Sequence, residues 1–157
     1  MSRIDDKFAI LKASGEKALI CFITAGDPDL ETTRRAILEL EKAGADIAEI
    51  GIPFSDPIAD GVSIQAASTR ALEHNVNVSD VLNLVRDIRK DSQIPVVLMT
   101  YFNPVMRYGT SRFAADAASA GADGVIITDL TPEESAVWKY EADRSGLNTI
   151  YLLAPTS

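Results

Sequence analysis

The chain has 157 residues, of which 46% are hydrophobic and 24% charged, and its formal net charge is -8. This length allows one domain with a real core, and the negative charge argues against nucleic acid as a partner, because phosphate backbones are bound by an excess of Lys and Arg. A single cysteine, Cys21, excludes an internal disulfide framework. No apolar run approaches the roughly 18 residues of a membrane span, and no signal-peptide pattern is present, so the expected location is cytoplasmic.

The first part of the chain predicts a helix, a strand and a second helix. Apolar residues spaced three and four apart predict a short amphipathic helix over Ser2 to Ala13. The apolar run from Ala18 to Thr24 predicts a strand. The Gly26-Asp27-Pro28 turn then leads into a helix that continues to about Ala43.

Strands and helices alternate through the rest of the sequence. The predicted strands are Asp46 to Ile50, Ile94 to Tyr101, Gly124 to Thr128 and Thr149 to Leu153. The predicted helices are Ser63 to His74, one starting at Val78 with Ser79 as N-cap, Phe113 to Ala120, and one starting at Pro132 with Thr131 as N-cap. No linker or low-complexity tract divides the chain, so residues 1–157 are predicted to form a single α/β domain with a parallel sheet.

A short motif is repeated before three of the strands. The copies are Ala43-Gly-Ala-Asp46, Ala120-Gly-Ala-Asp123 and, more weakly, Ser145-Gly-Leu-Asn148. Each copy is typical of a helix that ends at a glycine and is followed by a short loop and a buried strand. Aligning the copies places Glu49 opposite Ile126 and Tyr151, so the carboxylate is an exception within the chain's own pattern.

Glu49 is the strongest candidate for chemistry. An unpaired charge in a buried strand is costly, and desolvation raises the pKa of a carboxyl group. Glu49 also stands near the carboxyl end of its strand, where parallel α/β folds place catalytic groups. Asp56 and Asp60 lie in the loop that follows. Each of these aspartates also fits an ordinary turn, and Glu49 also fits an edge-facing or salt-bridged position.

Residues 49–61, which read EIGIPFSDPIADG, form a long motif of fixed spacing together with Ser63-Ile-Gln65. This motif resembles the signature of the tryptophan synthase α subunit family. Ala48 and Val62 depart from the family pattern, which usually has a larger aliphatic residue and a proline there. The resemblance covers the whole chain but only about the first three-fifths of the family's length. It implies a (β/α)8 TIM barrel, of which this chain supplies about five βα units plus an N-terminal helix.

The resemblance also implies an activity. Proteins of this family cleave indole-3-glycerol phosphate to indole and glyceraldehyde 3-phosphate in tryptophan biosynthesis, so the expected enzyme is a carbon-carbon lyase. By resemblance, Glu49 is the general acid/base and Asp60 binds the indole N–H. The residues expected to line or border the substrate pocket are Phe22, Met99, Tyr101, Ile126 and Asp129.

A partner is implied in the same way. The resemblance implies a tryptophan synthase β subunit in an αββα heterotetramer, with pyridoxal phosphate in the β subunit only and no cofactor or metal in this chain. The residues expected to face the partner are Pro53, Phe54, Asp56, Pro57 and Asn103. An exposed Phe54 between turn residues would suit a partner surface, although its ring could equally pack against the barrel rim.

Two other functions are consistent with the residues. Glu49, Asp56 and Asp60 could supply the oxygen ligands of a metal-dependent barrel aldolase or lyase. Alternatively, the chain could be non-catalytic and only dock on a partner. Five strands cannot close an eight-stranded barrel, so we expect either a longer polypeptide or a partner that covers the edge strands. We also expect no lyase activity from these 157 residues alone, because the family's phosphate-binding loops follow later strands.

Overall fold

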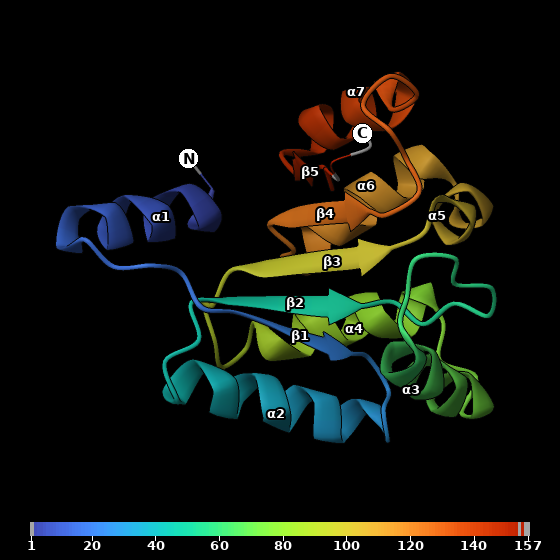
Figure 1. The fold of residues 1–157 in the computed structure, drawn as a ribbon, viewed down its shortest axis with the longest axis horizontal. Coiled ribbons are helices and arrows are strands. Elements are labelled where there is room, and N and C mark those ends of the chain that lie inside the picture. Colours follow the sequence, from blue (N-terminus) through green and yellow to red (C-terminus); the bar gives the residue numbers. More distant parts are fainter. Residues whose placement is uncertain (1, 154, 156–157) are drawn as a thin grey trace.

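The centre of the structure is one parallel β-sheet, seen in a computed structural model that describes residues 2–153 and 155 (Figure 1). The strands are β1 (Ile20–Thr24), β2 (Ile47–Gly51), β3 (Val96–Thr100), β4 (Gly124–Ile127) and β5 (Asn148–Ile150). They pair in chain order, and every pairing is parallel. All the predicted strands are therefore confirmed, with ends that shift by a few residues.

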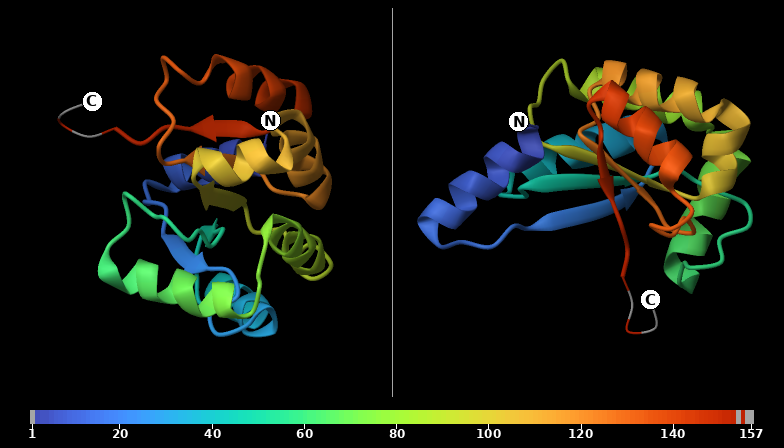
Figure 2. Two further views of the ribbon diagram at one scale, coloured as in Figure 1. Left: turned by 90° about the vertical axis from the view of Figure 1, so that its right-hand side faces the viewer. Right: turned by 90° about the horizontal axis from the view of Figure 1, so that it is seen from above.

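The helices are α1 (Arg3–Ser14), α2 (Leu30–Lys42), α3 (Val62–Glu73), α4 (Val78–Ile88), α5 (Phe102–Tyr108), α6 (Thr110–Ala120) and α7 (Ala136–Ser145). Helices α2 to α7 lie between the strands along the chain and cover one face of the sheet, whereas α1 precedes the first strand. Helices α2, α4, α6 and α7 pack one against the next. Seen from the carboxyl ends of the strands, the sheet is curved and open on one side (Figure 2, left).

The two faces of the sheet form two separate apolar clusters. Outward-facing residues such as Ile50, Leu98 and Val125 are fully buried against the helices in the larger cluster. A smaller cluster on the inner face contains Ile47 and Val97 together with Ile126. Because both faces carry apolar side chains, the strands read as nearly continuous apolar runs in the sequence.

The register of the strands arranges the inner face in two rows. The first row runs through Phe22, Glu49, Val97, Gly124 and Asn148, each the Cα partner of the next. The second row lies two residues nearer the carboxyl ends and runs through Thr24, Gly51, Met99, Ile126 and Ile150. Successive side chains of a strand point to opposite faces, so the residues of both rows share one face.

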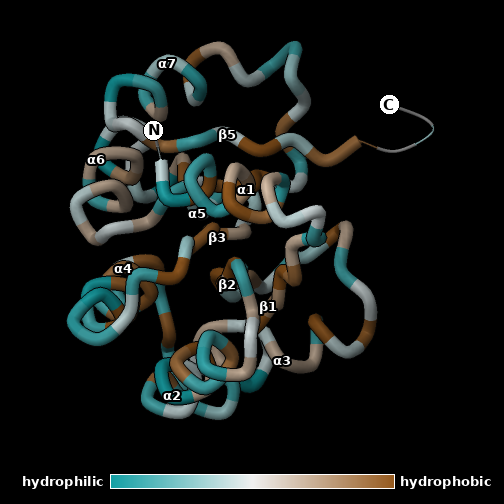
Figure 3. The backbone as a smooth tube through the Cα atoms, turned by 90° about the vertical axis from the view of Figure 1, so that its left-hand side faces the viewer, coloured by the Kyte–Doolittle hydropathy of each residue, from teal (hydrophilic) through white to brown (hydrophobic). Residues whose placement is uncertain are grey.

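Helix α1 lies across the amino ends of the strands (Figure 3). Its Ile4 side chain packs against the inner apolar cluster. Its polar side chains contact the final residue of each copy of the repeated motif. Lys7 Nζ lies 3.4 Å from Asp46, Arg3 Nη1 lies 3.0 Å from Asp123, and the Asn148 side-chain amide donates to Ser2 Oγ at 2.9 Å. The repeat therefore supplies the polar contacts that hold α1 beneath the inner face.

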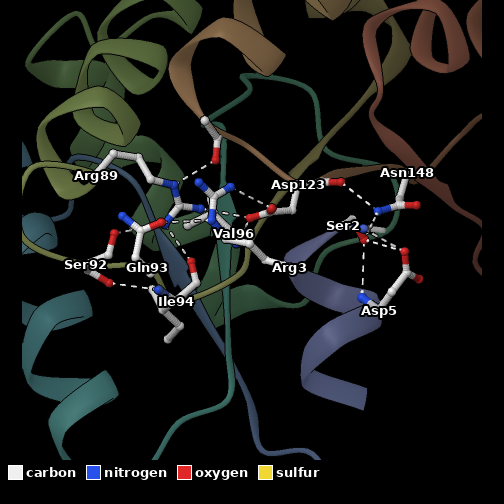
Figure 4. Close-up of polar contacts among 11 residues, drawn as sticks. Ser2, Arg3, Asp5, Arg89, Ser92, Gln93, Ile94, Val96, Asp123 and Asn148 are labelled. Carbon is white, nitrogen blue, oxygen red and sulfur yellow. Dashed lines mark hydrogen bonds and ion pairs between the residues drawn. The ribbon is translucent and has the colours of Figure 1, made fainter. Parts of the chain in front are cut away.

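Asp123 is the centre of a buried polar cluster (Figure 4). Its carboxylate accepts hydrogen bonds from Arg89 Nη2 at 2.9 Å, from the Val96 N–H at 2.8 Å and from Arg3. The Arg89 guanidinium also donates to the carbonyl oxygens of Gly121, at 2.8 Å, and Ile94, at 2.6 Å. These bonds join α1, the end of α4 and the starts of β3 and β4, so they fix the amino ends of the inner strands.

Two local predictions were wrong, and one helix was not predicted. The N-cap of α4 is Asn77 and not Ser79, because Asn77 Oδ1 accepts from the Ser79 and Asp80 N–H groups in a capping box. The N-cap of α7 is Ser135 and not Thr131, because the residues after Thr131 form turns instead of a first helical turn. The helix that was not predicted is α5, and Asn103-Pro104 lies in its first turn, where proline is tolerated.

In the weakest copy of the repeat, the inner-face side chain comes one residue earlier than the alignment of the copies predicts. The Ile150 side chain packs against the inner cluster, whereas the Tyr151 hydroxyl lies 2.5 Å from Ser135 Oγ, just before α7. Tyr151 is therefore not the inner-face equivalent of Glu49. The equivalence with Ile126 holds, because both residues lie on the inner face.

Candidate functional site

A small cavity lies at the carboxyl ends of the inner strands, where parallel α/β folds bind ligands. Its volume is about 20 Å³, and it is lined by Phe22, Asp60, Met99 and Tyr101 among others. These four residues come from β1, the loop after β2, β3 and the position directly after β3. The structure therefore brings together four of the seven residues predicted for catalysis or substrate binding.

Glu49 lies on the inner face of β2, one row below this cavity. Its register partners are Phe22 and Val97, and its nearest inner-face neighbours along the strand are Ile47 and Gly51. The side chain is half-buried, and burial raises the pKa of its carboxyl group. Among the described residues, no side chain forms a salt bridge with Glu49, so a structural ion pair does not explain its position.

Gly51 makes room for the Phe22 ring, which lies directly over it. A Cβ atom at this position would stand 2.6 Å from Phe22 Cζ and 2.9 Å from Cε2. The absence of a side chain on Gly51 therefore lets the ring lie across β2, at the level just beyond Glu49.

Asp60 is held near Tyr101 at the end of the loop that connects β2 and α3. The Gln65 side-chain amide donates to the Asp60 carbonyl at 2.8 Å. Burial, together with the charge of Asp60, raises the pKa of the Tyr101 hydroxyl. The carboxylate and the hydroxyl thus face the same small cavity.

The remaining predicted pocket residues lie apart from the cavity. Ile126 is buried in the inner cluster as the register partner of Met99, so it supports the cavity from the side. Asp129 Oδ1 accepts a hydrogen bond from the Phe102 N–H at 2.7 Å and so caps the start of α5. Asp129 therefore holds the end of β3 and α5 in this structure.

The residues predicted to face a partner lie on one loop and at the start of α5. Asp56 and Asn103 are exposed, Pro57 is half-buried, and Pro53 is buried. Phe54 is half-buried, with its ring centroid 5.3 Å from that of Tyr101. The Phe54 ring therefore packs against the rim while part of it stays exposed. Pro53 and Phe54 also line a groove of about 350 Å³ that extends to Pro104.

The metal-dependent alternative lacks its ligand set. Within residues 2–153 and 155, no three His, Cys, Asp or Glu side chains are grouped so that they could hold one metal ion. Glu49, Asp56 and Asp60 therefore do not form the carboxylate cluster that this alternative needs. None of the described helices has the length and apolar character needed to cross a membrane.

The structure adds four polar residues that the sequence analysis missed. They are Thr24, Ser68, Thr100 and Thr128, and all of them line the cavity. Thr24 Oγ1 is buried and makes no hydrogen bond to the described residues. Thr24 and Thr128 are the last residues of predicted strands. The rule that parallel α/β folds place functional groups at the carboxyl ends of strands could therefore have found both. Ser68 lies on α3, four residues after Ile64, which also lines the cavity. This helical spacing was the only signal in the sequence for Ser68.

Comparison with known proteins gives the family. Residues 8–157 match the family described as "Tryptophan synthase alpha chain". The chain is 57% identical over its full length to the tryptophan synthase alpha chain of Geotalea uraniireducens, of which it covers 59%. Tryptophan synthase subunit alpha from Legionella pneumophila is 49% identical and superimposes with a TM-score of 0.97, over 99% of this chain and 60% of that one. A chain in the tryptophan synthase a2b2 complex of Pyrococcus furiosus is 40% identical, with a TM-score of 0.85, over 88% of this chain and 56% of that one.

The chain thus spans about three-fifths of the length of the curated relatives it matches. Its consecutive parallel strands and covering helices form about five βα units of the (β/α)8 TIM barrel, which confirms the predicted fold. The match covers both the EIGIPFSDPIADG motif and the repeated motif before β2 and β4. The chain belongs to the tryptophan synthase alpha chain family.

Proposed function

We propose that the full natural chain containing these residues cleaves indole-3-glycerol phosphate to indole and glyceraldehyde 3-phosphate, in tryptophan biosynthesis in the cytoplasm. Family membership supports this reaction. The observation that carries the proposal is Glu49, a half-buried carboxylate without a salt bridge among the described residues, on the inner face next to the cavity that contains Asp60.

The reaction needs one proton to be delivered and another to be removed. Protonation of indole C3 places positive charge on the ring nitrogen. Removal of the proton from the hydroxyl on the adjoining glyceryl carbon then forms the aldehyde, and the carbon-carbon bond breaks. Its electron pair returns to the ring and gives indole. No net proton is consumed, so a single acid/base group could donate first and accept afterwards.

In this proposal Glu49 is that group. A general acid works best when its pKa lies near the working pH, and burial shifts the Glu49 pKa in that direction. Its neighbours Phe22 and Val97 are apolar and carry no charge. The indole ring of a bound substrate would therefore displace only water from around the Glu49 carboxyl group. Asp60 would accept a hydrogen bond from the indole N–H and stabilise the positive charge that develops there.

We further propose that the chain binds a tryptophan synthase β subunit in an αββα assembly, with pyridoxal phosphate in the partner only. The Pyrococcus furiosus relative belongs to a tryptophan synthase a2b2 complex. On this chain, Asp56 and Asn103 are exposed beside the groove that Pro53 and Phe54 line. The loop that carries Asp60 would therefore also carry part of the partner surface.

The test is an assay of indole release from indole-3-glycerol phosphate by the full natural chain, with and without the β subunit. The proposal predicts activity alone, higher activity with the partner, and unchanged activity in EDTA. No indole release under any condition would favour the alternative in which the chain only docks on a partner. Loss of activity in EDTA would instead revive the metal-dependent alternative.

A further inference from the structure

The loop 52–61 between β2 and α3 is fixed at both ends and exposed in the middle. Pro53 is buried at its start, whereas Ile58 is 82% exposed. Asp60 lies near the other end, where Gln65 of α3 holds its carbonyl oxygen. A catalytic carboxylate on such a loop needs further support, because loops are more mobile than the elements they connect.

Tyr101 contacts this loop at two places. The Tyr101 ring packs on Phe54 near the start of the loop, with centroids 5.3 Å apart and ring planes inclined at 35°. The Tyr101 hydroxyl oxygen accepts a hydrogen bond from the Ala59 N–H at 3.0 Å near the end. One side chain, directly after β3, therefore joins two points of the loop that are five residues apart in sequence.

Tyr101 is itself rigidly placed. It is 4% exposed and directly follows β3. The next residue, Phe102, donates its N–H to Asp129 at 2.7 Å, which anchors the start of α5 to the end of β4. The side chain can therefore hold the loop in a fixed position relative to the sheet.

We propose that Tyr101 is a positioning residue that fixes Asp60 by holding the preceding peptide group, at Ala59, and the Phe54 ring. The effect of Tyr101 on the reaction rests on the proposed function, in which Asp60 binds the substrate. The attachment of the loop to Tyr101 does not rest on it. Tyr101 acts on the reaction through Asp60 in this account.

The first arm of the test measures the loop directly in the full natural chain. Tyr101→Phe keeps the ring and removes the hydroxyl acceptor, so amide hydrogen exchange at Ala59 should accelerate about tenfold, on the scale of one lost hydrogen bond. Tyr108→Phe is the matched control, because its hydroxyl donates to Asp116 of α6, at 2.7 Å, and not to this loop. It should leave exchange at Ala59 unchanged. Phe54→Leu is a second variant, and it should accelerate exchange at Ala59 without altering Tyr101. Unchanged exchange in both Tyr101→Phe and Phe54→Leu would overturn the attachment.

The second arm uses a double-mutant cycle on indole-3-glycerol phosphate cleavage. Tyr101→Phe should lower kcat/KM about tenfold in the parent protein but less than about twofold in an Asp60→Asn background, because Asp60 is then no longer there to be positioned. An equal loss in both backgrounds would show that Tyr101 acts independently of Asp60 and would overturn the proposal. A parent chain without lyase activity would refute the proposed function, and with it the role of Asp60, while the exchange arm would still decide the attachment.

Discussion

Phe22 and Glu49 are register partners on β1 and β2, so an aromatic ring and a half-buried carboxylate share one row of the inner face. Val97 continues this row on the other side of Glu49, and Gly51 leaves space for the Phe22 ring at the next level. The carboxylate is thus surrounded by apolar groups and lies next to the cavity that holds Asp60. This combination distinguishes Glu49 from the other acidic residues.

The first prediction concerns the stability of the full natural chain as a function of pH. The pKa of Glu49 is raised above its ordinary value of 4.5 by burial, so the folded state holds this proton more tightly than the unfolded state does. The stability of the parent relative to a Glu49→Gln variant should be greatest below pH 4.5 and should fall as the pH rises through the folded-state pKa. Denaturant unfolding of both proteins across this range would measure the difference, and a difference independent of pH would contradict the prediction.

The second prediction concerns the buried ion pair of Arg89 and Asp123. Asp123→Ala should lower the free energy of unfolding by about 3–5 kcal/mol, because it leaves the buried Arg89 guanidinium without its counter-charge. The matched control is Asp143→Ala, which removes the exposed pair with Lys139 on α7 and should cost about 0.5 kcal/mol or less. Similar losses in the two variants would show that the buried cluster does not fix the strand ends.

The third prediction uses the glycines of the repeated motif. Gly44 and Gly121 both have positive φ angles, of 104° and 98°, so alanine is strained at either position. An added Cβ would meet nothing within 4 Å at Gly44 but would stand 2.8 Å from Arg89 Cγ at Gly121. Gly121→Ala should therefore cost about 1–3 kcal/mol more than Gly44→Ala in chemical denaturation. Equal costs would mean that Arg89 moves aside freely.

The fourth prediction concerns the proposed partner surface. Phe54→Ala and Asn103→Ala should each weaken binding of the full natural chain to the β subunit, whereas Val137→Ala, at an exposed position on α7, should not. Phe54→Ala should weaken binding more, because it also releases the loop from Tyr101. Calorimetry would measure the three affinities. Unchanged binding in both Phe54→Ala and Asn103→Ala would show that the interface lies elsewhere on the chain.

The strands and the repeat could be predicted from the sequence because they depend on local pattern. Buried parallel strands give short apolar runs, and a glycine ends the preceding helix at Gly44, Gly121 and Gly146. The predicted N-caps Ser79 and Thr131 were wrong because several residues nearby could cap, and the choice depends on side-chain geometry. Helix α5 was missed because its first N–H is satisfied by Asp129, 27 residues away.

The candidate site was only partly accessible to sequence reasoning. Glu49 stood out because its own repeat made it an exception, and the resemblance added Phe22, Met99 and Tyr101, which the structure brings to one cavity with Asp60. The attachment of Ala59 to Tyr101 joins residues 42 positions apart, so no local pattern signals it. The same is true of Ser68, which lines the cavity only because α3 packs beside β1.

The fifth prediction, and the most direct test of the account, is the kcat of a Glu49→Gln variant of the full natural chain on indole-3-glycerol phosphate. The account predicts a loss of about 10² to 10⁴ in kcat, the range for removal of a general acid/base. Circular dichroism and unfolding should show an intact fold, because glutamine is a neutral isostere at a half-buried position. A folded Glu49→Gln protein that retains the parent's kcat would contradict the central role of Glu49.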